Sequence, residues 1–416
     1  MTPTKSITVD DIELGRFRFW GEPIESRDAV FARLRTEQPV AFHSRLDHLP
    51  GTPTPRGFWS VTSYAGVREV SRNPQLFSSE DGIRVDESLN TDFDDSSRSI
   101  ITMDDPRHVK LRLVVQAGFT PKAVAKIEIS VRERAHQLVM SAKERGGTMD
   151  FVENFSAALP LQVICDMLGI PPSDEQQLFD WTNVINGIGD PEYGVSLDTL
   201  LDAITALDSY AIELGRDRRA HPRDDIASIL MASEVDGQRL TDREFANFFN
   251  LLIAAGNETT RNAISWGAKL LTEHPDQREQ LRADYPALSL RAADEIVRWS
   301  SPVIHMRRVA TEDTVLGGHE ITAGDKVVMW YWSANRDESV FPNGSKFDIH
   351  RSNAKDQVGY GSGGPHFCLG ANLARREIQV MFDEILRELP DLEIVAEPTR
   401  LMSSFLNGIK RMPCAV

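Results

Sequence analysis

Apolar residues recur at helical spacing through the middle of the chain. Between residues 105 and 300, amphipathic runs with apolar positions three and four residues apart predict helices over residues 121–143, 197–219 and 242–273. Proline and glycine interrupt the pattern where helices would end, as in residues 169–172 (GIPP). The middle of the chain is therefore predicted to be almost wholly helical.

Nearer the two ends the pattern changes to short strands and turns. Residues 57–62 alternate like a strand, residues 64–70 indicate a helix, and the polar stretch 78–99 is predicted to be loop. After Pro302, strands are predicted over residues 314–316, 320–322 and 326–331, and a last helix over residues 369–389. The predicted fold class is mostly α with small β-sheets, which excludes a doubly wound α/β sheet.

Composition and charge narrow the class of protein. The chain has 416 residues, 41% hydrophobic and 26% charged, without a repeat or a Gly/Ser-rich linker, so we expect a single domain over residues 1–416. A net charge of −16 disfavours nucleic acid and anionic membranes as partners. No apolar run reaches the roughly 18 residues of a membrane span, and no signal peptide is recognisable, so we expect a cytoplasmic protein without a membrane anchor.

The three cysteines are far apart and odd in number, so no disulfide framework is predicted. Cys165 lies in an apolar helical run and is interpreted as a core residue, whereas Cys414 carries no signal. Cys368 lies in a glycine-rich loop, residues 360–370 (YGSGGPHFCLG), directly before a helical run. Glycines there would let a flat ligand approach the backbone, and the helix N-terminus would stabilise a thiolate. The alternative for an isolated cysteine is a small buried hydrophobe.

A second unusual segment, residues 252–260 (LIAAGNETT), lies inside the long apolar helix predicted over residues 242–273. Gly256 weakens a helix by about 1 kcal/mol relative to Ala, and a buried acid and hydroxyl are unfavourable unless they are hydrogen-bonded. Such unfavourable residues indicate a functional role for Glu258 and Thr259. The alternative is a helix kink in which Thr259 bonds back to a carbonyl oxygen.

Together these segments resemble the cytochrome P-450 family. The loop is similar to its haem-binding signature, aromatic-Gly-x-Gly-x-His-x-Cys-x-Gly, with Tyr360 in place of the usual Phe and one extra residue before Cys368. The resemblance implies the cytochrome P-450 fold, with haem b (iron protoporphyrin IX) between the long distal helix and the helix after the cysteine loop. It implies Cys368 as the iron ligand and Thr259 and Glu258 as the catalytic proton-delivering pair.

Other positions match the family residue by residue. The resemblance implies that His108, Arg112, Arg308 and His366 hold the haem propionates, and that the cofactor also lies against Ala255, Gly256, Gly361 and Gly370. Glu295 and Arg298, with Arg351, match the family's Glu-x-x-Arg pair, which has a structural role beside the cysteine loop. Taken alone, each of these charged residues would be interpreted as a solvated surface group.

The resemblance also gives a substrate class. By family position the pocket includes Leu251, Ala254, Val303, Ile304, Met306 and Phe405, all apolar, together with Ala255 and Leu406. From Phe19 onward the sequence is similar to that of actinobacterial enzymes that hydroxylate terminal carbons of methyl-branched lipids, terpenoids and sterol side chains. We therefore expect such an apolar small molecule as substrate. A steroid or polyketide nucleus is the alternative, because apolar pockets discriminate by only about 1 to 3 kcal/mol per methylene.

The implied reaction is a monooxygenation that uses O2 and two electrons. No dinucleotide fingerprint of the GxGxxG kind is fused to the chain, so a ferredoxin and a ferredoxin reductase are the expected electron donors. A basic patch around Lys110, Arg375 and Arg376 is the expected docking surface. Two other classes are a peroxygenase and a non-catalytic haem- or ligand-binding protein, and Glu258 and Thr259 count against both.

Overall fold

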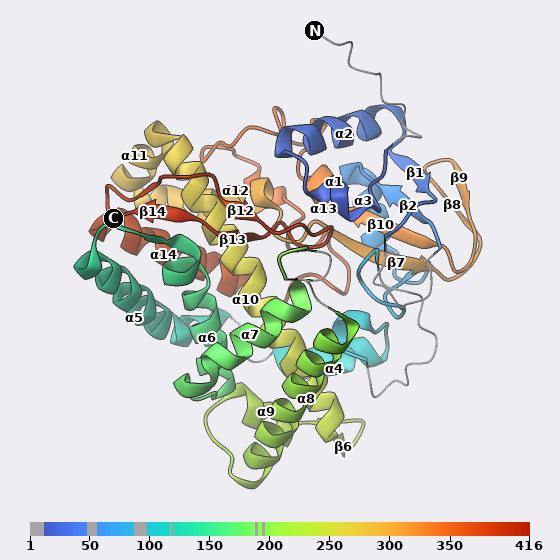
Figure 1. The fold of residues 1–416 in the computed structure, drawn as a ribbon. Coiled ribbons are helices and arrows are strands. Elements are labelled where there is room, and N and C mark those ends of the chain that lie inside the picture. The colour runs from blue at the N-terminus through green and yellow to red at the C-terminus, as the bar shows by residue number, and fades with distance from the viewer. Residues whose placement is uncertain are drawn as a thin grey trace.

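The computed structural model describes residues 12–47, 56–86, 98–116, 119, 121–187, 190–193 and 196–416, with backbone alone for residues 121–126. Residues 87–97 of the predicted loop 78–99 lie outside this part. Helices dominate the fold, and the strands form small sheets (Figure 1). The predicted fold class is therefore confirmed.

The helices follow the apolar stripes of the sequence. They are α1 (Phe17–Trp20), α2 (Ile24–Glu37), α3 (Tyr64–Arg72), α4 (Arg107–Gln116), α5 (Pro121–Arg145), α6 (Ala158–Leu168), α7 (Glu175–Asn186), α8 (Leu197–Ala220), α9 (Ile226–Ala232), α10 (Asp242–Glu273), α11 (Pro275–Ala283), α12 (Tyr285–Ser300), α13 (Tyr331–Ala334) and α14 (Ala371–Glu388). A π-helical turn, η5 (Val152–Ser156), precedes α6, and short 3-10 turns are η3 (Ile100–Thr102), η6 (Pro172–Asp174) and η7 (Ala354–Asp356). The four long predicted helices match α5, α8, α10 and α14 to within two residues at each end.

The largest sheet has five strands in the order β1-β2-β10-β7-β3. Its strands are β1 (Val40–His43), β2 (Phe58–Val61), β3 (Phe77–Ser78), β7 (His305–Ala310) and β10 (Lys326–Trp330). In β10, Val328 lies opposite Ser60 of the parallel β2 and opposite Arg307 of the antiparallel β7. The sheet thus joins strands from the two ends of the sequence. Tyr331, predicted to end a strand, instead begins α13.

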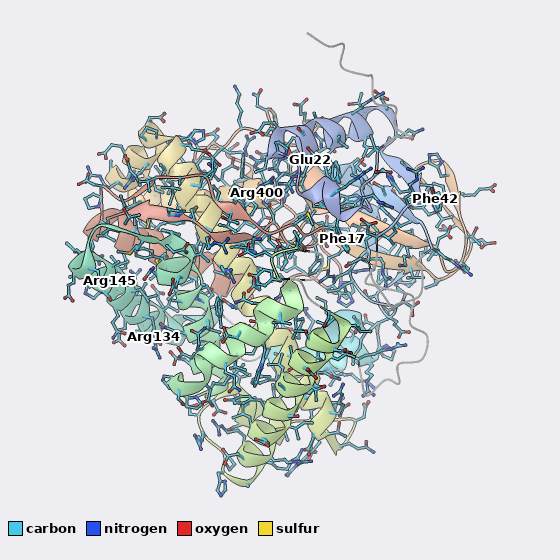
Figure 2. The ribbon with its side chains drawn as sticks, viewed as in Figure 1. Phe17, Glu22, Phe42, Arg134, Arg145 and Arg400 are labelled. Atoms are coloured by element: carbon cyan, nitrogen blue, oxygen red, sulfur yellow. The ribbon has the colours of Figure 1, made fainter. Side chains whose placement is uncertain are left out.

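The remaining strands form three small two-stranded sheets and one three-stranded sheet. These contain β8 (Thr314–Leu316) with β9 (His319–Ile321), β5 (Glu234–Val235) with β6 (Gln238–Arg239), β12 (Thr399–Arg400) with β13 (Ile409–Arg411), and β11 (Glu393–Ile394), β14 (Pro413–Ala415) and β4 (Thr148–Asp150). Figure 2 shows Phe42 at the outer edge of the large sheet and Arg400 beside Glu22, whose carbonyl oxygen accepts a hydrogen bond from Arg400 Nη2 at 2.7 Å. The C-terminal segment is thereby tied to the N-terminal helices.

Helix α10 is the central element of the helical part. It begins at a capping box, in which Thr241 Oγ1 accepts from the backbone of Glu244 and the Glu244 carboxylate accepts from the backbone of Thr241. Over its 32 residues it packs against α6, α8, α12 and α14, and it runs through the middle of the molecule in Figure 1. Most of its surface is buried, so a polar residue in its middle is in contact with protein or with an internal cavity.

Candidate functional site

A cavity of about 220 Å³ lies between α10, α4, β7 and the loop that leads into α14. Its wall is mostly apolar, with a few basic and hydroxyl groups. The apolar wall includes Ile100, Ile101, Phe119, Ile164, Leu251, Leu252, Ala255, Ala263, Val303 and Met306. The opposite wall is formed by residues of the loop and of α14, including Gly361, Phe367, Cys368, Leu369 and Gly370.

The glycine-rich loop turns tightly before it enters α14. The backbone N–H of Cys368 donates to the carbonyl oxygen of Tyr360 at 2.8 Å, which closes the loop. Gly363 and Gly364 have φ angles of +89° and +79°, which only glycine adopts without strain.

The C-terminal end of α3 supports the same loop. Ser71 Oγ donates to the carbonyl oxygen of Gly363 at 2.8 Å, and Arg72 Nε donates to that of Ser362 at 3.3 Å. A Cβ at Gly364 would lie 2.2 Å from the Ser71 carbonyl oxygen, so the contact allows no side chain. The position of the cysteine is therefore fixed from outside the loop as well as within it.

The Cys368 thiol opens into the cavity. Its side chain is accessible there, whereas Cys165 on α6 and Cys414 are buried in the core. Burial raises the pKa of the Cys368 thiol, while the backbone N–H groups of Gly370 and Ala371 at the start of α14 act in the opposite direction. Burial also raises the pKa of Cys165 and of Cys414 to about 12, as expected for inert core thiols.

Four basic side chains converge at one end of the cavity. The rings of His108 and His366 lie 4.3 Å apart between centroids, and Arg112 and Arg308 line the same cavity. Within the described residues neither arginine forms an ion pair with an acid, and His108 Nε2 is buried without a hydrogen-bond partner. Burial lowers the pKa of His108, and burial with the charges of Arg308 and His108 lowers that of His366 to about 2. The cluster is thus rich in donors, and in the described part of the chain neither arginine has a carboxylate partner.

These features fit a haem. Its two propionates would supply anionic partners for Arg112 and Arg308 and an acceptor for His108 Nε2. A Cβ at Gly370 would meet no atom within 4 Å, since this glycine faces the open cavity beside the cysteine. An accessible sulfur, a glycine-lined wall and a basic end match an iron ligand, a flat macrocycle and its acidic edge in turn.

On α10, the Glu258 carboxylate and the Thr259 hydroxyl line two different cavities. Thr259 lines the cavity with Ala255 and Gly256, and Thr259 Oγ1 donates to the carbonyl oxygen of Ala255 at 2.8 Å. Glu258 is buried, pairs with Arg261 Nη1 at 3.0 Å and lines a separate polar pocket of about 10 Å³. Consecutive helical residues are about 100° apart, and on α10 this rotation turns Glu258 away from the cavity that Thr259 lines. Within the described residues Glu258 does not contribute to the wall of the larger cavity.

The expected substrate-pocket residues are only partly brought together. Leu251, Val303 and Met306 line the cavity, whereas Ala254, Ile304 and Phe405 are not part of its described wall. For these three residues a place in the substrate pocket stays a prediction. Ile304 is fully buried in the core beside Trp330.

Phe405 is engaged elsewhere. Its ring contacts the His305 ring edge-on, with centroids 5.5 Å apart, and lies beneath the Arg84 guanidinium at 5.4 Å. Position in the chain alone does not show which side of an extended segment faces inward. Ile100, Ile101, Phe119 and Ile164 complete the apolar wall, and sequence reasoning missed them because they are ordinary apolar residues of distant segments.

Other residues of the wall were missed although they are polar. Tyr331, Tyr360, Thr260 and Glu377 also line the cavity. Tyr360 was noted only as the aromatic residue of the loop, and among the described residues its buried Oη has no hydrogen-bond partner. For Glu377, a signal was available: an acid on the apolar face of a helix that begins directly after the cysteine loop.

The predicted Glu-x-x-Arg pair is a buried structural centre. Glu295 and Arg298 on α12 form two hydrogen bonds of 2.7 Å and have no exposed side-chain surface. Arg351 Nε donates to Glu295 Oε1 at 3.2 Å, and Arg298 Nη1 donates to the carbonyl oxygens of Asn335 and Gly344 at 2.6 Å each. The pair therefore holds the segment that leads from α13 toward the cysteine loop, rather than forming a solvated surface contact.

The three basic residues expected to form a docking surface each have an acid partner within the chain. Lys110 pairs with Asp236 at 2.8 Å, Arg375 with Asp294 at 2.7 Å, and Arg376 with Glu128 at 3.5 Å. Part of their charge is therefore already countered. Among the helices of the described residues, none combines the length and the hydrophobicity that a membrane crossing requires.

Comparison with known proteins agrees with this geometry. The family model described as "Cytochrome P450" matches residues 198–287 and 290–406. A methyl-branched lipid omega-hydroxylase of Mycobacterium tuberculosis (strain H37Rv) is 47% identical over 414 residues, 99% of this chain and 96% of the relative. A steroid C26-monooxygenase of Mycolicibacterium smegmatis is 41% identical over 385 residues, 91% of this chain and 88% of the relative.

Solved structures show the same architecture. The structure of a Mycobacterium marinum cytochrome P450 in complex with pseudoionone superposes with a TM-score of 0.92 at 39% identity and covers 100% of both chains. A cytochrome P450 from Bacillus megaterium in complex with testosterone gives a TM-score of 0.78 at 31% identity, covering 93% of this chain and 98% of the other. With its thiol-bearing cavity and these relatives, the chain belongs to the cytochrome P450 family of haem-containing monooxygenases.

Proposed function

We propose that this monooxygenase hydroxylates a terminal carbon of a methyl-branched lipid, isoprenoid or sterol side chain. The observation that carries the proposal is the apolar wall of the cavity beside Thr259, to which Ile100, Ile164, Leu251 and Met306 contribute. Burial of an apolar chain end against this wall would favour binding by about 25 cal/mol per Å² of buried apolar surface, and the chain end has no polar group whose lost hydration would offset this gain. Similarity to a methyl-branched lipid omega-hydroxylase and to a steroid C26-monooxygenase points to the same substrate class.

The cofactor we propose is haem b. Cys368 would ligate the iron, and His108, Arg112, Arg308 and His366 would hold the propionates. Bound haem supplies the activation of dioxygen that side chains alone cannot perform. The remaining chemistry falls to the residues of the chain.

Positioning is the first task of those residues. The C–H bond of a terminal methyl group is stronger than that of a methylene, so oxidation of the end carbon requires that other carbons be kept away. Val303 and Met306 on one side of the cavity and Leu251 on α10 would confine a narrow alkyl end by contact. The apolar wall also excludes water from the reacting carbon.

Proton supply is the second task. Thr259 holds a proton on Oγ1, which it now donates to the Ala255 carbonyl oxygen, and a rotation about χ1 would turn that hydroxyl toward the cavity. Glu258, paired with Arg261, is the expected source of protons for this hydroxyl, from the opposite side of α10. Water in the small polar pocket that Glu258 lines would carry a proton from Glu258 toward Thr259.

For electrons, we propose a ferredoxin and its reductase, with the reaction taking place in the cytoplasm. Lys110 on α4 and Arg375 and Arg376 on α14 flank the cysteine loop, and Arg112 Nη2 donates to the carbonyl oxygen of Phe367 within that loop. An acidic partner that docked here would compete for these cations with Asp236 and Glu128. Electron transfer that becomes slower as salt increases would support this docking face.

The test combines a spectrum and a panel of ligands. The reduced protein under carbon monoxide should show the Soret band of a thiolate-ligated haem, and Cys368→Ala should abolish it. Methyl-branched fatty acids, isoprenoids and sterols are then titrated against the oxidised protein, with straight-chain fatty acids as the matched control. A spin shift and terminal hydroxylation of the branched compounds would support the proposal. Preference for straight chains, or attack on a steroid ring, would contradict the proposed substrate.

A further inference from the structure

Arg27, near the start of α2, is a buried cation without a hydrogen-bond partner among the described residues. Its relative exposure is 2%, and neither Nε nor Nη2 donates to an acceptor there. The guanidinium carbon lies over the Trp332 ring at 4.8 Å and over the Trp20 ring at 5.8 Å to the centroids. Ring contacts leave the N–H groups at the edge of the guanidinium unmatched, and a buried charge is unfavourable unless it is paired. This edge is therefore suited to an acceptor from outside the chain.

Further positive charge lies close to Arg27. Burial lowers the pKa of Arg27 to about 9, and the charges of Arg400 and Arg336 act in the same direction, ahead of the opposite effects of Asp28 and Glu25. The Asp28 carboxylate is already engaged, since it accepts from Arg336 Nε at 3.0 Å. Within the described residues no carboxylate forms an ion pair with Arg27. At neutral pH the side chain is thus a buried cation beside a second, Arg400.

The N-terminal end of α2 adds backbone donors at this place. The helix begins after Pro23, no side chain of the described residues caps it, and its first N–H groups have no acceptor within the helix. Helical side chains lean toward the N-terminus, so the Arg27 guanidinium lies toward this end. Arg400 reaches the same end from β12, where Nη2 donates to the carbonyl oxygens of Gly21 at 3.1 Å and Glu22 at 2.7 Å (Figure 2). Two guanidinium groups and a helix N-terminus therefore come together.

We propose that Arg27, Arg400 and the first backbone N–H groups of α2 form an oxyanion site, which takes a carboxylate or a phosphate group. Guanidinium groups bind such ions through pairs of parallel hydrogen bonds, and the dipole of a helix is positive at its N-terminus. The oxyanion has two possible sources, the carboxylate of a branched fatty acid and a free phosphate ion. In either case the bound ion would join α2 to β12. The inference goes beyond the proposed function and does not depend on the substrate.

The first test is a calorimetric titration of the holoenzyme with inorganic phosphate, in chloride buffer at constant ionic strength. The wild type should bind one phosphate per chain. Arg27→Met and Arg400→Gln should each bind it at least about tenfold more weakly, because each loses one guanidinium. Arg33→Gln is the matched control, since Arg33 lies on the same helix but is exposed and pairs with Glu37 at 2.8 Å. Its titration should match that of the wild type.

The second test separates an ion-binding arginine from a purely structural one. In chloride, Arg27→Met should unfold at the same urea concentration as the wild type or at a higher one, because the substitution removes a buried charge that has no partner. In phosphate, the wild type should become more resistant to urea and the variant should not, because only the wild type binds the ion. A loss of stability in Arg27→Met that is equal in the two buffers would overturn the proposal.

Lipid titrations distinguish the two sources of the oxyanion. A methyl-branched fatty acid and its methyl ester are titrated against the wild type and Arg400→Gln, with the spin shift of the haem as the signal. If the site takes the lipid carboxylate, Arg400→Gln should weaken binding of the acid about tenfold but not that of the ester, and phosphate should compete with the acid. If it takes free phosphate, the two proteins should bind both lipids alike and differ only with phosphate. Identical behaviour of the wild type and both arginine variants in every titration would overturn the site, whereas failure of all branched lipids to bind would contradict only the proposed substrate class.

Discussion

At the scale of single residues, the basic end of the cavity makes a clear prediction. Arg112 is half-buried, has no acid partner among the described residues and donates to the carbonyl oxygen of Phe367. Arg112→Leu removes both the charge for a propionate and the link to the loop, so haem should be lost about ten- to a hundredfold faster, equivalent to about 1.4 to 2.7 kcal/mol. Transfer of haem to apomyoglobin measures the rate.

Arg107 offers the matched control on the same helix. Its side chain is largely exposed and pairs with Glu244 instead of pointing into the cavity. Arg107→Leu should therefore leave the rate of haem loss at the wild-type value. Equal rates in the wild type and in Arg112→Leu would contradict the assignment of Arg112 to a propionate.

The residues that belong to the site were easier to predict from the sequence than the directions in which their side chains point. Cys368 could be identified because a cysteine in a run of glycines before a helix is typical of a ligand-binding loop and unusual in a packed core. The same reasoning could not show that Glu258 faces away from the cavity, or that Ile304 packs into the core beside Trp330. Such directions depend on the rotation of a helix and the twist of a strand relative to their neighbours, and the local sequence pattern determines neither of them.

At the scale of elements, the contact between α3 and the cysteine loop is sterically tight enough to test with one methyl group. In Gly364→Ala, the new Cβ would lie 2.2 Å from the Ser71 carbonyl oxygen at a φ of +79°. We expect a loss of about 2 kcal/mol or more in the free energy of unfolding, together with a lower haem content. Urea unfolding and the ratio of Soret to protein absorbance measure the two effects.

Gly318→Ala separates the collision from the backbone strain. Gly318 has a similar φ of +84°, but a Cβ there would meet no atom within 4 Å. This variant should lose only the roughly 1 kcal/mol of a left-handed alanine and keep its full haem content. If both variants behaved alike, the α3 contact would not be what positions the loop.

The buried Glu295–Arg298 pair predicts a larger effect on the same loop. Glu295→Gln leaves Arg298 and Arg351 buried with a neutral partner, and breaking a pair of this kind is unfavourable by about 3–5 kcal/mol. The variant should fold poorly and bind little haem. An exposed pair, Arg282 with Glu279, gives the comparison: Glu279→Gln should leave the free energy of unfolding almost unchanged, because solvent screens an exposed pair.

The long helices α5, α8, α10 and α14 could be predicted because each carries its own apolar period, and α10 begins at a capping box that is visible in the sequence. The sheets could be predicted only as separate short strands. The pairing of Val328 with Ser60 joins residues from opposite ends of the chain, and nothing local to either strand indicates its partner. The cavity is equally hard to predict from the sequence, because β7 and α4, which border it, come from distant parts of the chain.

At the scale of the whole molecule, buried histidines make the fold sensitive to acid. His43 stacks on Phe58 and its Nδ1 donates to the Ile12 carbonyl oxygen, while Nε2 is buried without a partner. His305 joins distant segments: its Nε2 accepts from the backbone N–H of Val85 at 2.9 Å, and its Nδ1 donates to the Ser404 carbonyl oxygen at 2.9 Å. Burial lowers the pKa of each histidine to about 4.

The sign of the pH dependence follows from those shifts. Between the ordinary histidine pKa of about 6.5 and the folded value of about 4, the unfolded chain binds protons that the folded chain does not bind. The free energy of unfolding should therefore fall as the pH is lowered through this window, by up to about 1.4 kcal/mol per pH unit for each histidine. His43→Phe loses one hydrogen bond at every pH but removes one of the histidines that titrate in this window. Urea unfolding of the wild type and His43→Phe between pH 7 and pH 4.5 should thus give a shallower slope for the variant, and parallel slopes would show that His43 is not held neutral by the fold.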